Sequence, residues 1–142
     1  MAISFYNSYK KNVLDGTIDL VNDTIKMMIV TSSYTPNVDS HNFIDDVSTN
    51  EVSASGTYSA GGVTLASKTT TQDDTDNEGV FDFTDPSVTT ATITGRYVVF
   101  YKDTGTPGTS PLICYDDLGS NQSSTNGTWT YVVPAEGLIN TN

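Results

Sequence analysis

The chain has 142 residues and a formal net charge of −11, from six basic and seventeen acidic side chains. This length fits one domain with a core of its own, and the negative charge repels phosphate and anionic lipid, so we expect neither nucleic acid nor a membrane as a partner. The single cysteine, Cys114, excludes an internal disulfide, a cysteine metal cluster and a redox pair. The sequence has no signal-peptide pattern and no long apolar run, so we expect a soluble protein made in a cytoplasm.

The N-terminal region contains the best candidate for a helix, at residues 5–14. Phe5, Tyr9 and Val13 recur every four residues, which places them on one helical face. Ser4 would cap this helix and Gly16 would end it. We therefore expect residues 1–16 to form an N-terminal arm or short helix, residues 17–139 a single β domain, and residues 140–142 a polar tail.

The next segment predicts a β-hairpin followed by a long connection. Residues 17–21 and 24–31 are short apolar runs on either side of Asn22-Asp23, two residues that tolerate the backbone of a tight turn. In the second run Ile25, Met27 and Ile29 share one face, and Lys26, Met28 and Val30 share the other. Residues 32–50 are polar, and a connection of this length packs by its own aromatic residues or contacts a partner.

The second half of the chain predicts further strands and exposed loops. Strands are expected at residues 51–53, 63–69, 80–83, 112–115 and 128–133, with a turn at Asp85-Pro86. The polar and acidic residues 70–77 and the Gly/Ser/Asn-rich residues 116–127 are expected to be loops.

The clearest strand signal is the alternation over residues 91–102. One face would carry Ala91, Ile93, Gly95, Tyr97, Val99 and Tyr101, and the other Thr92, Thr94, Arg96, Val98, Phe100 and Lys102. With strands at this spacing and no helices between them, the predicted fold class is all-β, an antiparallel β-sandwich or small β-barrel with one short N-terminal helix.

Arg96 lies in this strand and has two interpretations. It could contact a ligand or partner, or it could form an ion pair with an acidic residue while its aliphatic stem covers apolar surface. We favour the ion pair, because a chain this acidic offers carboxylates throughout.

Four patterns suggest chemistry, and each has a simpler structural explanation that we favour. Oxygen ligands alternate from Asp74 to Glu78, with Asp85 at the twelfth position, as in a calcium loop, but the long bidentate Glu is missing and a solvated acidic loop is the better explanation. His41 lacks a serine in a nucleophile elbow. Neighbouring carboxylates such as Asp45-Asp46 and Asp116-Asp117 leave a strand on opposite faces, so they cannot flank one bond. Cys114 lies in an apolar run and is expected to be buried and inert. We therefore assign no catalytic, cofactor-binding or metal-ligating residue and expect a protein that is not an enzyme.

Aromatic residues leave a binding role open. A sugar-binding platform could be built from Tyr58, Tyr97, Tyr101, Tyr115, Trp129 and Tyr131. In a β-sandwich such residues more often fill the core and its rims.

Four segments in order give a family resemblance. They are residues 25–36, ending in Ser33-Tyr34-Thr35-Pro36; Glu51-Val52 with residues 58–62; residues 91–99; and residues 110–113. Together they resemble small virion structural proteins of tailed bacteriophages, across about residues 17 to 139. The resemblance implies a β-rich particle component, and capsid decoration, or cement, is the favoured role.

This resemblance implies a location, partners and a contact surface. The protein would be made in the host cytoplasm and lie in the virion, bound to the outer face of the major capsid protein as a homo-oligomer, with a trimer favoured. The expected interface residues are Phe5, Tyr6, Tyr9, Tyr34, His41, Phe43 and Ile44. The alternative is a tail-associated or adhesion module that binds a bacterial surface glycan through an exposed Trp129 or Tyr58.

Overall fold

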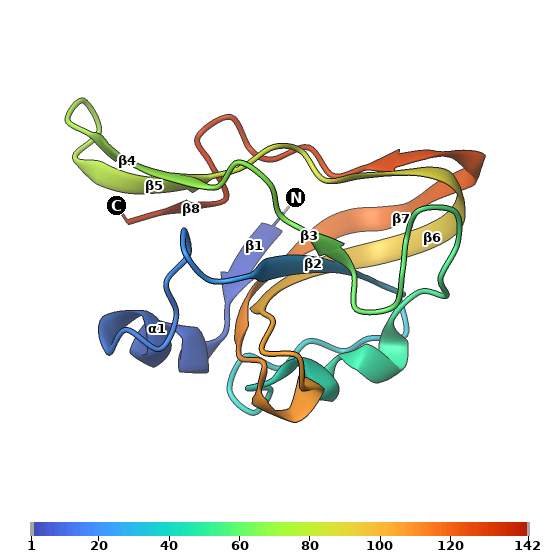
Figure 1. Ribbon diagram of the computed structural model, residues 1–142, viewed down its shortest axis with the longest axis horizontal. Helices are drawn as coiled ribbons and strands as arrows, with labels where there is room; N and C mark the ends of the chain where they lie inside the picture. The colour runs from blue at the N-terminus through green and yellow to red at the C-terminus, as the bar shows by residue number, and fades with distance from the viewer. Residues whose placement is uncertain (1, 142) are drawn as a thin grey trace.

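A computed structural model describes residues 2–141 and confirms the all-β fold class, with two antiparallel sheets and one short helix in a sandwich-like arrangement (Figure 1). The larger sheet has the order β1-β7-β6-β2-β3 and the smaller one β4-β5-β8. The strands are β1 Ala2–Phe5, β2 Ile25–Val30, β3 Val63–Thr64, β4 Thr69–Asp73, β5 Glu78–Asp82, β6 Ser87–Lys102, β7 Leu112–Thr130 and β8 Ile139–Asn140. The helix α1 spans Asn7–Leu14, and three short 3₁₀ helices are η1 Ile44–Asp46, η2 Ser48–Asn50 and η3 Pro107–Thr109. Among residues 2–141 there is no helix long and apolar enough to cross a membrane.

The N-terminal arm is part of the larger sheet. Residues 2–5 pair with β7, from Ala2 opposite Asp117 to Phe5 opposite Cys114, so α1 begins at Asn7 and not at Phe5. The predicted cap at Ser4 is therefore wrong, because that residue lies in β1. Phe5 therefore does not share a helical face with Tyr9 as predicted, although their rings stack with centroids 5.6 Å apart across the β1–α1 junction.

The predicted strand at residues 17–21 is absent, and these residues form turns. The carboxylate of Asp19 accepts hydrogen bonds from the backbone N–H groups of Val21 (3.1 Å) and Asn22 (3.0 Å). Such local bonds offer the backbone an alternative to a sheet ladder, which is why the apolar pattern did not produce a strand. The other strand of the predicted hairpin, residues 24–31, is confirmed as β2.

Two predicted loops are strands. Residues 116–127 belong to β7, which pairs with β6 along most of its length, and residues 69–73 form β4. Their polar composition is typical of loops. Most of these side chains face solvent, and some form hydrogen bonds with side chains of the neighbouring strand. Thr94 and Ser123 share a hydroxyl hydrogen bond of 2.9 Å, and so do Ser87 and Thr130. Threonine favours a pleated surface even where it is exposed.

The paired strands β6 and β7 turn back at one end of the molecule and take part in both layers (Figure 1). The register of the two strands shifts at four places, and at one of them Gly95 pairs with Gln122 and Tyr97 with Asp117, so residues 118–121 oppose Arg96 alone. The single apolar face predicted for residues 91–101 is therefore wrong. Ala91 and Ile93 pack in one core cluster, whereas Val99 and Tyr101 pack in the other.

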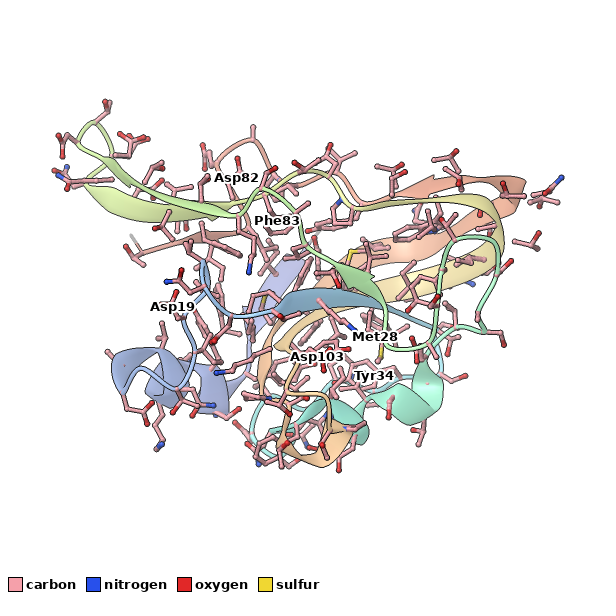
Figure 2. All side chains as sticks on the ribbon, in the orientation of Figure 1. Asp19, Met28, Tyr34, Asp82, Phe83 and Asp103 are labelled. Carbon is pink, nitrogen blue, oxygen red and sulfur yellow. The ribbon has the colours of Figure 1, made fainter. Side chains whose placement is uncertain are left out.

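The two core clusters lie on opposite faces of the larger sheet. Figure 2 shows Phe83 on one side of β2 and Met28 with Tyr34 on the other. The first cluster fills the space between the sheets, and Ile25, Met27 and Ile29 belong to it as predicted. The second lies under the connection between β2 and β3, and contains Tyr6, Met28, Val30, Tyr34, Ile44, Val47, Val99, Tyr101 and Leu112.

The C-terminal end also joins a sheet. Asn140 of the predicted polar tail lies in β8, and the N–H of Thr141 donates to the carbonyl of Gly79 (3.1 Å). The structure does not describe Met1, the first residue of the predicted arm, or Asn142, the last residue of the predicted tail.

Close packing around Gly95 of β6 predicts that one added methyl group lowers the stability of the fold. A Cβ added to Gly95 would lie 2.4 Å from the side chain of Ile29. We expect Gly95→Ala to lower the free energy of unfolding by about 1–3 kcal/mol, the usual cost of overpacking. Gly127→Ala is the control in the partner strand, because its Cβ meets only Thr125 at 3.5 Å. Urea denaturation measures both, and equal stabilities of the two variants would contradict the packing argument.

Candidate interaction surface

The expected interface residues come together, but most of them face inward. Tyr6, Tyr9, Tyr34 and Ile44 are buried, whereas Phe5 and His41 are partly exposed. Of the seven, Phe43 is the most accessible, at 39% exposed. The contact role of this set remains a prediction, and any contact would be made through Phe43 and the rims of Phe5 and His41.

The buried members form a hydrogen-bonded chain that joins the N-terminus to the long connection. The hydroxyls of Tyr6 and Tyr34 lie 2.8 Å apart, and that of Tyr34 is 2.9 Å from Nδ1 of His41. The rings of Tyr34 and His41 stack at 5.6 Å. Burial raises the pKa of Tyr34 to about 12 and that of Tyr6 further, so both hydroxyls stay neutral and hold structure.

Backbone hydrogen bonds complete this junction. The N–H of Asn7 donates to the carbonyl of Val38 (3.0 Å), and its side chain donates to Asp39 (2.6 Å). The N–H of Ile44 donates to the carbonyl of Ser110 (2.9 Å). Helix α1, residues 31–50 and residues 104–110 therefore form one continuous surface, which we call the loop face (lower part of Figure 1).

The outer side of the loop face carries exposed apolar groups. Leu14, at the end of α1, is 88% exposed, and Phe43 projects from the start of η1. The carboxylate of Asp46 accepts the N–H groups of Asn42 (2.8 Å) and Phe43 (3.3 Å), which fixes the backbone there. The loop face thus presents apolar side chains from a backbone that internal hydrogen bonds hold in place.

Positive charge is scarce on the rest of the surface. Four of the six basic residues form ion pairs: Lys11 with Asp15, Lys26 with Asp103, Arg96 with Asp117, and Lys102 with Asp23. Lys68 donates to the backbone carbonyl of Asp23, and Lys10 to the side chain of Asn7. The most exposed ammonium among the ion pairs is that of Lys11, on α1.

The acidic residues of the predicted calcium-like loop form the turn between β4 and β5. Oxygens of Asp73, Asp76 and Glu78 lie within 4.8 Å of one another, and burial together with the neighbouring carboxylates raises the pKa of Glu78. Asp85 is engaged elsewhere, accepting the N–H of Val133 (2.8 Å). The predicted twelve-residue spacing does not form one site, and a solvated acidic turn describes this segment.

The remaining chemical candidates are structural. Cys114 is buried, which raises the pKa of its thiol and leaves it unreactive. Asp116 points into the core, whereas Asp117 faces outward and pairs with Arg96. Neighbouring carboxylates on this strand therefore do not converge, as the alternation predicted.

The two residues that the glycan-binding alternative would expose, Trp129 and Tyr58, are both buried. Trp129 is 5% exposed, and its Nε1–H donates to the carbonyl of Gln122 (3.1 Å). The hydroxyl of Tyr58 is buried, donates to Glu51 (2.8 Å) and accepts the N–H of Ile29 (3.0 Å). A hollow of about 520 Å³ is lined by Leu118, Gln122, Ser123 and residues 128–135, and Trp129 contributes to it only the 5% of its surface that is exposed.

Comparison of the chain with protein-family models, with curated proteins and with solved structures finds no match. The fold and the loop face are therefore described from this chain alone.

The ion pair favoured for Arg96 is present and is bidentate. Its Nε lies 2.7 Å from Asp117 Oδ1 and its Nη2 lies 3.2 Å from Oδ2. We expect Arg96→Ala to lower the melting temperature and Arg96→Lys to recover only part of it, because a point charge cannot reproduce a two-pronged contact. Lys11→Ala, which removes an exposed pair, is the control, and calorimetry measures all three. Equal melting temperatures for Arg96→Ala and Arg96→Lys would contradict this role.

The buried carboxyl of Asp116 predicts a pH dependence of stability. It accepts hydrogen bonds from Tyr131 (2.6 Å) and from the N–H of Ala2 (2.9 Å), and burial raises its pKa. A raised pKa favours the neutral form in the folded state, so its contribution is present at low pH and lost as pH rises through the folded pKa. We expect Asp116→Asn to gain melting temperature over the parent as pH increases from 4 to 7. A pH-independent difference would contradict this expectation.

Proposed function

We propose that this chain is a non-enzymatic structural protein of a phage virion, which decorates the outer capsid surface by binding the major capsid protein through the loop face. Its resemblance to small virion proteins of tailed phages supports the setting. The loop face is chosen as the binding surface because hydrogen bonds from Asn7 to Val38 and Asp39 join the N-terminal segment to the long connection.

The rigidity of the loop face suits it to such a contact. The second core cluster lies beneath it and anchors it by Tyr6, Tyr34 and Ile44. A surface already held in its bound shape loses little conformational entropy on binding, so moderate contact areas give useful affinity. Repeated over the many identical sites of a shell, modest contacts add up by avidity.

The acidic surface supports an outward position and no direct contact with packaged DNA. A net charge of −11 repels nucleic acid, and each of the six basic side chains has a polar partner within the chain. The trimer implied by the resemblance is kept as a separate prediction.

The exposed apolar residues of the loop face provide the test. We expect Phe43→Asp and Leu14→Asp to weaken binding to purified shells by about tenfold or more, since a charge would replace a desolvated apolar contact. Val132→Asp is the matched control, because Val132 is 63% exposed but lies in the segment after β7. Co-sedimentation with shells that lack the protein measures occupancy.

Imaging of the particle decides between head and tail. The proposal requires density for this protein on the outer shell, in contact with the major capsid protein. Density restricted to the tail would overturn the capsid role and favour a tail-associated role, whereas equal loss of shell binding in the Val132→Asp control would overturn the choice of the loop face.

A further inference from the structure

The edge of the smaller sheet is unusually open. Strand β4 pairs with β5 on one side and ends the sheet on the other, and the hairpin extends beyond the rest of the molecule in Figure 1. It has five residues, whereas β1, β3 and β8, which also end a sheet, have four, two and two. Natural edges are protected by charged side chains, above all Lys, by Pro or by a bulge. Residues 69–73 contain no Lys, Pro or bulge, and their one charged side chain, Asp73, lies at the end of the strand.

Hydrogen bonds on the other side of β5 fix which backbone groups of β4 are free. The carbonyls of Phe81 and Gly79 accept from Leu138 (2.9 Å) and Thr141 (3.1 Å), so these two residues of β5 face β8. Alternation then turns Val80 toward its partner in β4, Thr71. The N–H and C=O groups of Thr70 and Gln72 therefore point outward, and both residues are exposed.

This edge is complementary to itself in an antiparallel register. With a two-fold axis at Thr71, Thr70 of one copy lies opposite Gln72 of the other, and the two exchange both backbone hydrogen bonds. By the same symmetry, Gln72 of the first copy exchanges two backbone hydrogen bonds with Thr70 of the second. The two Thr71 side chains then lie opposite each other, which is a favourable cross-strand pair. Thr69 lies opposite Asp73, where a hydroxyl can donate to the carboxylate.

Charges just outside the strand fit the same register. Lys68 of one copy lies opposite Asp74 of the other, on the face of the sheet that carries Gln72. The side chain of Gln72 already donates to the carboxylate of Asp74 and holds it there. Lys68 uses one donor on the carbonyl of Asp23, and an ammonium has three. Both flanks of the axis thus place opposite charges together.

We propose that a second copy of the chain docks along β4, giving a six-stranded sheet across a two-fold axis. This inference is independent of the proposed capsid role, because β4 lies outside the loop face. It competes with the trimer implied by the resemblance, since a two-fold contact closes at two copies.

The first test removes the outward N–H of Thr70. This group makes no bond to β5, so Thr70→Pro should leave the hairpin intact while deleting two hydrogen bonds per dimer. We expect sedimentation of the full chain to give twice 15.2 kDa at high concentration. Thr70→Pro should raise the dimer dissociation constant about tenfold or more, and Thr70→Val, which keeps the N–H, should change it little. The salt concentration should be about 0.15 M, where the Debye length of about 8 Å limits general repulsion.

The second test reverses the flanking charges and does not depend on the proline variant folding. Asp74→Lys makes the chain less negative by two charges, so general repulsion alone would strengthen association. The register predicts the opposite, because Lys68 would then face a lysine. Lys68→Glu should also weaken the dimer, and the double variant should restore it, with unchanged melting temperatures as the control for folding. A monomer at concentrations on the order of 1 mM, a trimer, or a dimer that is insensitive to both tests would overturn the proposal. If β4 instead binds an extended segment of another protein, the purified chain would be a monomer, and this result would also overturn the proposed dimer.

Discussion

The fold depends on one constraint, which is that the paired strands β6 and β7 must bury apolar side chains in two layers at once. Near β2 they are covered on both faces, with Val98 and Phe100 in one core cluster and Val99 and Tyr101 in the other. Beyond the register break at Gly95 they turn over the first cluster and cover it. A straight pair of strands this long would leave that cluster open, and the turned part closes it with Val88, Ala91 and Ile93 of β6 and Trp129 of β7.

The loop face follows from the same constraint. Met28 and Val30 of β2 and Val99 of β6 form an apolar surface on the side away from the smaller sheet. Water contact with that surface would be costly, and residues 31–50 cover it with Tyr34, Ile44 and Val47. The connection is therefore ordered although it has little regular structure. Its inner side is committed to the core, and only its outer side is available to a partner.

The sequence predicts the fold where apolar alternation is strong and misses it where polar side chains carry the strand. The two faces of β2 followed from period two alone. Residues 116–127 did not, because Ser, Asn and Gly are typical of loops and their cross-strand hydroxyl pairs require knowledge of the partner. A register break is likewise invisible in one strand, since it depends on the count of residues in the other.

The candidate interface was predicted by segment and not by side chain. The N-terminal segment and the long connection do lie together, but the aromatic residues that marked them are the ones that join them internally. A large aromatic residue in a loop is a good indicator of packing and a weak indicator of exposure. The exposure of Leu14 was missed for the opposite reason. It ends a short helix and lies off the predicted face of Phe5 and Tyr9, so the spacing of apolar residues gave no reason to select it.

The distribution of charge limits the kinds of contact that this chain can make. The few basic residues are used to hold the frame together, as where Lys102 binds Asp23 and the carbonyl of Thr17 and so ties residues 15–24 to β6. Within residues 2–141, four acidic residues pair with a basic side chain and the others do not, so a binding partner is expected to be basic or to bind through uncharged groups. The loop face and the edge of β4 both offer uncharged groups, which are apolar side chains on the loop face and threonine-flanked backbone groups on the edge. They lie on different parts of the molecule, the loop face in the lower part of Figure 1 and β4 at its upper left.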